Sequence, residues 1–190
     1  PVVETVKLFE ELRKGSPFML QLRLKGLPLN AVKDQLKELS TNKPDGTLLI
    51  LNDYDRAVLD FPFDGIHLGQ EDLLVADVEL IKSNKLILGI STHGLYELAV
   101  AKFMKPSYVA LGPVFDTICK SMKFGPQGID QLSVWKKVLV DIPLIAIGGL
   151  NIDRSNEALK RGADVVAVQS DVTLKERPLD QLNKYHSELV

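Results

Sequence analysis

Short runs of consecutive apolar residues recur along this chain and alternate with segments of helical periodicity. A run such as 144–147 (LIAI) has no polar positions, which is typical of a strand buried on both faces of a parallel sheet. The segments between the runs place apolar residues three or four positions apart, as amphipathic helices do. The alternation predicts a β/α fold. The predicted strands are 18–22, 47–51, 65–68, 86–90, 108–111, 144–147 and 165–168, and the predicted helices are 2–13, 28–39, 75–83, 94–104, 129–140, 153–161 and 178–189.

Polar residues follow nearly every predicted strand, and this placement favours a closed barrel over an open sheet. In a barrel the carboxyl ends of all strands form one active-site face, whereas an open sheet concentrates its functional residues at one switch point. We therefore expect a single α/β domain over residues 1–190, a (β/α)8 TIM barrel. Such a barrel needs eight strands and the pattern shows seven, so we expect the first strand to be missing from this chain, before Val2.

Composition narrows the classes of partner. With 23 basic and 25 acidic residues the chain has no excess positive charge for nucleic acid or an anionic membrane. No apolar run approaches the ~18–20 residues of a membrane span, and no signal peptide is evident. The single cysteine, Cys119, cannot form an internal disulfide. We expect a cytoplasmic enzyme with small-molecule partners, and the pattern leaves a homo-oligomer open.

Two carboxylates, Asp53 and Asp72, follow successive predicted strands at the same end of the sheet. Mg²⁺ usually takes one or two protein carboxylates and leaves its other positions to water and substrate phosphate. The pair therefore predicts a Mg²⁺ site, and two solvated loop aspartates are the alternative on this pattern alone. No histidines have the spacing of a metal-ligand motif.

Groups that bind anions occur at other strand ends. Gln21, Arg23 and Lys25 lie on one side of their strand, because side chains alternate with a period of two, although a solvated edge strand would show the same pattern. The long loop 114–127 carries Lys120, and loops of this length in compact domains are often functional.

A phosphate site is predicted after the last two strands. Gly148 and Gly149 allow backbone N–H groups to approach an oxyanion closely, and Ser170 adds a hydroxyl. Barrels of this class commonly bind phosphate at these two strand ends. Taken alone, a glycine pair also ends many strands simply because the chain turns tightly.

Six motifs at successive strand ends together give the chain a family resemblance. They are QLRLK (21–25), LND (51–53), GIHLGQED (65–72), GISTH (89–93), GPVFDTICK (112–120) and AIGG (146–149). In their order and spacing they resemble the thiamine phosphate synthase family, and segment 120–128 resembles one branch of it. The resemblance implies a (β/α)8 barrel that joins hydroxymethylpyrimidine pyrophosphate to thiazole phosphate and releases pyrophosphate, a transferase of thiamine biosynthesis.

The resemblance also implies roles for individual residues. The pyrimidine carbon can lose pyrophosphate before the thiazole nitrogen captures it, so the site must mainly stabilise a departing anion. Three cations, with Mg²⁺ on two aspartates, give a charge of about +3 against about −3 on pyrophosphate. The implied catalytic residues are Arg23, Lys25, Ser91 and Lys120, the metal ligands are Asp53 and Asp72, and the further substrate contacts are Gln21, Asn52, Thr117, Cys119, Gly148, Gly149, Gln169 and Ser170.

The chain departs from the family pattern at two positions. Cys119 stands where threonine is usual, and a thiol donates hydrogen bonds poorly. Asp171 stands where a small neutral residue is expected, and its charge would oppose a nearby phosphate unless the side chain points away. We interpret His67, His93 and Trp135 as packing or loop residues.

Two alternative functions remain on the sequence. A related barrel, the thiazole tautomerase, resembles the chain at 117–120, but it carries a histidine base where this chain has Pro113, and without that base tautomerisation loses its proton acceptor. A non-catalytic barrel that binds a phosphate ligand is the other alternative. Retention of the aspartate pair beside the cationic cluster argues against it.

Overall fold

Eight parallel strands pair in sequence order to form the barrel wall. The computed structural model describes residues 1–24, 28–52, 54, 57–117 and 125–189. Each strand pairs with the next one along the chain, and the N–H of Val2 donates to the Val168 carbonyl at 3.0 Å, which joins the last segment to the first. The strands are β1 (Val2–Val3), β2 (Met19–Leu22), β3 (Leu48–Asn52), β4 (Gly65–Leu68), β5 (Ile87–Thr92), β6 (Tyr108–Leu111), β7 (Leu144–Ile147) and β8 (Val165–Ala167). The predicted (β/α)8 barrel is confirmed.

The prediction that the first strand is missing is wrong. Val2 and Val3 form β1 and pair with Gln21 and Leu22 of β2. The sequence pattern concealed this strand because two valines also fit the apolar face of the helix predicted over 2–13. The helix begins only at Val6, where the Thr5 hydroxyl accepts the Leu8 N–H at 3.2 Å and caps it. The gap expected between β2 and β8 is therefore occupied by β1.

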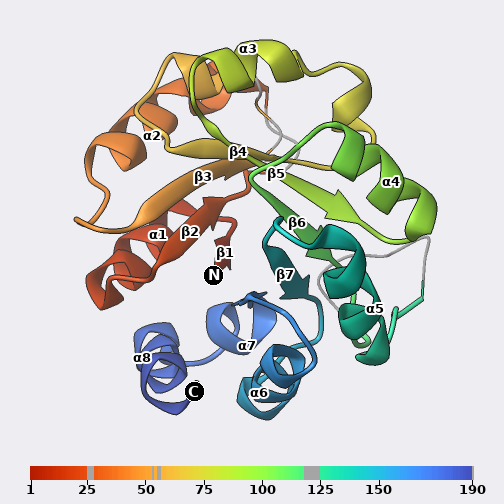
Figure 1. Ribbon diagram of the computed structural model, residues 1–190. Coiled ribbons are helices and arrows are strands. Elements are labelled where there is room, and N and C mark those ends of the chain that lie inside the picture. The colour runs from red at the N-terminus through yellow and green to blue at the C-terminus, as the bar shows by residue number, and fades with distance from the viewer. Residues whose placement is uncertain (25–27, 53, 55–56, 118–124, 190) are drawn as a thin grey trace.

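Helices follow the strands and lie outside the ring of strands (Figure 1). Their positions agree with the predicted helices, apart from their ends and one extra helix, α7, directly after β8. Helix α6 is capped by Asn151, whose side chain accepts the Arg154 N–H at 2.9 Å. No helix in the described ranges is long and apolar enough to cross a membrane. The helices are α1 (Val6–Leu12), α2 (Leu29–Thr41), α3 (Val78–Ser83), α4 (Leu95–Phe103), α5 (Asp130–Leu139), α6 (Ile152–Lys160), α7 (Ser170–Thr173) and α8 (Pro178–Glu188), with short 3-10 turns at Arg13–Gly15, Ala57–Leu59 and Asp72–Leu74.

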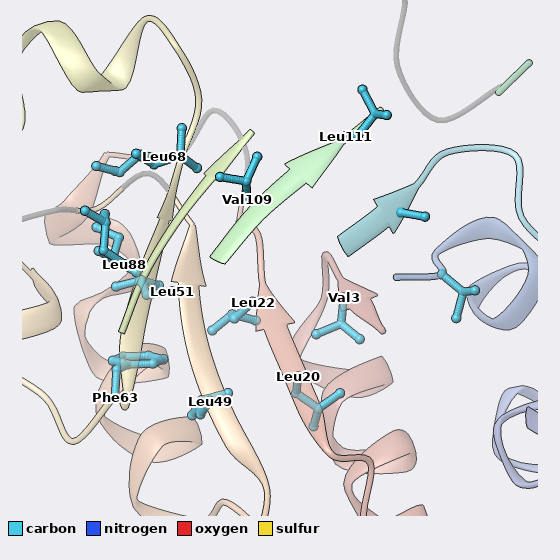
Figure 2. Packing of buried hydrophobic residues seen from close by; sticks show 14 of the residues in the cluster. Val3, Leu20, Leu22, Leu49, Leu51, Phe63, Leu68, Leu88, Val109 and Leu111 are labelled. Atoms are coloured by element: carbon cyan, nitrogen blue, oxygen red, sulfur yellow. The ribbon is translucent and has the colours of Figure 1, made fainter. Parts of the chain in front are cut away.

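Alternate residues along the strands enter two separate cores. Residues such as Leu22, Leu51 and Val109 are buried on the side that faces the helices, where they form the larger core (Figure 2). The intervening residues form a smaller cluster inside the barrel, centred on Tyr108 and Ile145. Because neighbouring side chains on a strand point to opposite faces, β2 and β5 to β8 each contribute to both cores.

Gly89 makes room for the side chain of Tyr108 inside the barrel. Gly89 pairs with Tyr108 across β5 and β6, and a Cβ atom at Gly89 would overlap the Tyr108 ring. The ring therefore lies over the bare backbone of its neighbour. This arrangement brings the Tyr108 hydroxyl to His67 on the other side of Gly89, at 2.9 Å.

We expect Gly89→Ala to destabilise the protein by about 1–3 kcal/mol, because the added methyl group must displace the Tyr108 ring in a packed interior. Gly125→Ala is the control, since a Cβ atom there meets nothing within 4 Å. Urea unfolding of both variants measures the difference. Equal unfolding midpoints for the two variants would contradict this packing account.

Candidate active site

The predicted site residues that the structure describes all lie at the carboxyl ends of strands, or just beyond them. Gln21, Asn52 and Ser91 belong to β2, β3 and β5 themselves. Lys25, Asp53, Cys119 and Lys120 lie outside the described residues. The others follow the strands: Arg23 after β2, Asp72 after β4, Thr117 after β6, Gly148 and Gly149 after β7, and Gln169 and Ser170 after β8.

Gln21 and Asn52 form one polar pair across β2 and β3. The Gln21 amide nitrogen donates to the Asn52 side-chain oxygen at 3.0 Å. Asn52 is buried, so its amide is held in one orientation relative to Gln21. A fixed donor and acceptor pair of this kind can recognise a planar nitrogen heterocycle.

Ser91 belongs to a second polar group, with His67 and Tyr108. The two ring nitrogens of His67 hydrogen-bond to the Tyr108 hydroxyl at 2.9 Å and to the Ser91 hydroxyl at 2.7 Å. Gln70 donates from its amide to the Ser91 carbonyl at 2.7 Å. Ser91 is therefore held through both its side chain and its backbone.

Burial, followed by the charge of Arg23, lowers the pKa of His67 to about 4. Burial also raises the pKa of the Tyr108 hydroxyl. Near neutral pH the imidazole is uncharged and the phenol is protonated, so one ring nitrogen donates and the other accepts. The prediction that His67 is a packing residue missed its link to Ser91. The sequence contained a signal for this role. Side chains alternate with a period of two along 65–69, which puts His67 on the same face as Gly65 and Gly69 and opposite Ile66 and Leu68.

The other two residues interpreted as packing or loop residues have that role. Trp135 is 2% exposed and packs in the outer core. His93 lies in the turn before α4, where its ring nitrogen lies 2.8 Å from a Glu97 carboxylate oxygen and its N–H donates to the same oxygen.

Arg23 has an acidic partner that the sequence analysis did not anticipate. Its guanidinium lies 3.1 Å from the Glu4 carboxylate, and Arg23 is partly buried whereas Glu4 is exposed. Glu4 directly follows β1, the strand that the pattern concealed. The charge of about +3 expected for the three cations and the Mg²⁺ site did not include this carboxylate. With Glu4 counted, the charge of the site falls to about +2.

Asp72 is held at the start of the turn after β4. Its Oδ2 accepts the Gly69 N–H at 2.8 Å, and within the described ranges no hydrogen bond involves Oδ1. A carboxylate with one oxygen fixed and the other available suits a hard cation such as Mg²⁺. The described residues contain no cluster of three or more potential metal ligands, and Asp53 is not among those residues.

Two residues of the predicted phosphate site, Gly149 and Ser170, line one pocket, and Gly148 directly precedes Gly149. Thr117, Gly149 and Ser170 line a pocket of about 330 Å³ beyond the ends of β6, β7 and β8. Gly148 and Gly149 have φ angles of +98° and +66°, which favour glycine. A Cβ atom at Gly148 would lie 2.6 Å from the Pro113 Cα, so this glycine also lets the two loops touch.

Asp171 lines the same pocket as Ser170, but its carboxylate is bound by side chains of α8 and by Lys175. Its carboxylate accepts hydrogen bonds from Gln181 at 2.9 Å and from the Tyr185 hydroxyl at 2.8 Å, and Lys175 lies 3.1 Å away. The unfavourable charge noted in the sequence is thus used to attach α7 to α8. Gln169 lines a different pocket, of about 380 Å³, between α1 and α7, apart from Ser170.

Comparisons with known proteins agree with this geometry. Residues 3–172 match the family model described as "Thiamine monophosphate synthase". A thiamine-phosphate synthase from Rhizobium etli is 39% identical over 93% of this chain and 87% of its own length. One from Yersinia pestis is 42% identical over 92% of this chain and 81% of its own.

A solved structure of a thiamine phosphate pyrophosphorylase from Pyrococcus furiosus superposes with a TM-score of 0.83. It is 29% identical, and the match covers 97% of this chain and 90% of that one. Sequence and architecture therefore agree over nearly the whole chain. The chain belongs to the thiamine monophosphate synthase family, a family of transferases, as the resemblance at its strand ends implied.

Proposed function

We propose that this chain joins hydroxymethylpyrimidine pyrophosphate to thiazole phosphate and releases pyrophosphate, the thiamine phosphate synthase reaction. One observation carries the proposal beyond family membership. A buried polar set on β2 to β5 and a separate phosphate-sized pocket beyond β6 to β8 share one end of the barrel. A reaction between two different substrates needs two adjoining sites of this kind.

The polar set on β2 to β5 is suited to the pyrimidine. Gln21 and Asn52 offer amide groups that are fixed relative to each other, and Ser91 offers a hydroxyl held by His67. Fixed groups orient the aminopyrimidine ring so that its reactive carbon faces the second substrate. Orientation of this kind contributes to rate because little freedom is lost in the transition state.

Departure of pyrophosphate requires compensation of its developing charge. Arg23 supplies one cation, held in place by Glu4, and Lys25 and Lys120 are proposed to supply the others. Glu4 reduces the net charge at rest and fixes the direction of the guanidinium. The mechanism follows as dissociation of the carbon–oxygen bond, then attack of the thiazole nitrogen on the pyrimidine carbon, with both electrons of the broken bond leaving on pyrophosphate.

Mg²⁺ is proposed to bind Asp72 together with Asp53. The oxygen donors and the available Oδ1 of Asp72 fit such an ion. When bound, it would offset part of the charge of the leaving pyrophosphate. Residues on the neighbouring strand ends would orient the same leaving group.

The pocket beyond β6 to β8 is suited to the thiazole phosphate. Its backbone at Gly149, its Ser170 hydroxyl and Thr117 surround a space large enough for a phosphate ester. We further propose that the enzyme acts in the cytoplasm on small molecules. The balance of 23 basic and 25 acidic residues supports small-molecule substrates, since it favours neither nucleic acid nor an anionic membrane.

The proposed reaction is tested directly with purified protein. We expect thiamine phosphate and pyrophosphate to appear in equal amounts when both substrates and Mg²⁺ are present, and neither product when one substrate is omitted. Chromatography of the product with a coupled pyrophosphate assay measures this. Absence of thiamine phosphate from correctly folded protein would refute the function.

Asp72→Asn tests the metal site. The change nearly conserves volume but removes a charge from the proposed ligand, so we expect the Mg²⁺ concentration for half-maximal activity to rise on the order of tenfold or more. Glu79→Gln is the matched control, because its side chain is 87% exposed on α3. An unchanged Mg²⁺ requirement in Asp72→Asn would leave Asp72 only its role in holding the Gly69 turn.

The lowered pKa of His67 predicts that the free energy of unfolding decreases in acid. Its folded pKa of about 4 lies below the unfolded value of about 6.5, so below pH 6.5 the unfolded chain binds the additional proton. Stability should therefore fall as the pH drops, by about 2 kcal/mol from this group between pH 7 and pH 5. Urea unfolding at both pH values should show a smaller loss in His67→Gln than in the wild type, and equal losses would contradict the assignment.

A further inference from the structure

Arg154 lines the phosphate pocket, and neither the sequence motifs nor the role of Ser170 accounts for it. The residue lies in the first turn of α6, beside Gly149. Its guanidinium donates to the Gly149 carbonyl at 2.7 Å and lies 4.5 Å from the centre of the Phe115 ring. One side chain thus connects the turn after β7 with the loop after β6.

The position of Arg154 is not explained by helix stability. The amino end of a helix carries partial positive charge, so a cation in the first turn of α6 is unfavourable there. Arginine and alanine have similar intrinsic preferences for helices. The side chain is exposed, so its contact with Phe115 contributes little to folding.

The charges around the pocket give Arg154 a role in binding. The described lining residues include two cations, Arg154 and Lys175, and two carboxylates, Asp116 and Asp171. Lys175 is already paired with Asp171. Among the described residues, no carboxylate lies within ion-pair distance of Arg154. Without Arg154 the lining would carry a net negative charge, and a phosphate would be repelled.

We propose that Arg154 is the specificity-determining residue for the phosphate group of the second substrate. The inference rests on the proposed function and adds to it the residue that distinguishes the phosphate monoester from the free alcohol. The guanidinium keeps one N–H on the Gly149 carbonyl and has further N–H groups for the phosphate oxygens. It also holds the backbone of Gly149 in position against the loop at Phe115.

Arg154→Ala tests the proposal. We expect the KM for thiazole phosphate to rise about 10–100-fold, because a charge-assisted contact is lost. The KM for the pyrimidine pyrophosphate should stay within about twofold, since that substrate binds at β2 to β5. Arg154→Lys retains the charge without the planar fork and should give an intermediate KM.

Arg161→Ala is the matched control. Arg161 caps the other end of α6 and pairs with Asp130 at 2.7 Å on the outer surface, so its loss should leave both KM values unchanged. Thermal unfolding of all three variants checks that folding is retained. Equal increases in both KM values, or a lysine variant as impaired as the alanine variant, would overturn the proposal.

Binding of inorganic phosphate, measured by calorimetry, separates this inference from the proposed function. The wild type and Arg161→Ala should bind phosphate alike, and Arg154→Ala about 10–100-fold more weakly. This result would support the role of Arg154 even if no thiamine phosphate were formed. Equal phosphate affinity in Arg154→Ala and the wild type would refute the role even if the enzyme were active.

Discussion

Closure of the barrel by β1 is the constraint on which the rest of the structure depends. Two residues, Val2 and Val3, pair with β2, and the Val2 N–H reaches the carbonyl of Val168. Without this short strand, β2 and the segment after β8 would present unpaired edges, which natural sheets avoid. Closure also places Glu4 beside Arg23 and brings the ends of β7 and β8 next to those of β1 and β2. The site is therefore a consequence of the ring and not of any single loop.

Inside the ring, apolar and polar side chains occupy different levels. Tyr108 and Ile145 belong to the apolar inner cluster. The Tyr108 hydroxyl is the link to the polar level, where it meets His67 and through it Ser91. Because burial keeps the imidazole neutral, this chain of hydrogen bonds introduces no uncompensated charge into the interior. The packed apolar cluster around Tyr108 and Ile145 thereby holds the polar groups in fixed positions before any substrate binds.

The sequence predicted the fold class and the strand ends well, because continuous apolar runs and the polar residues after them are local signals. The sequence did not predict β1, because two valines before a helix show no periodicity of their own. The pairing of Glu4, directly after β1, with Arg23 was therefore not predicted either. The sequence predicted Ser91 as a site residue but not the hydrogen bond between Ser91 and His67, which depends on strand register. It flagged Asp171 by its charge, but only the packing of α8 against α7 shows where the carboxylate points. Contacts between residues far apart in the sequence cannot be predicted from the pattern of neighbouring residues.

The two halves of the site differ in the physics that would govern binding. The polar set on β2 to β5 is buried and its groups bind one another, so substitutions there leave partners unsatisfied and affect folding as well as activity. The pocket beyond β6 to β8 is more open, and its lining charges are close to balance. A change of one charge there alters the attraction for an anion while disturbing few packed atoms. Affinity for the phosphate-bearing substrate can therefore vary largely independently of the chemistry, since Arg23, Lys25, Asp53 and Asp72 follow β2 to β4 and, of the groups proposed to act on the departing pyrophosphate, Lys120 alone follows β6.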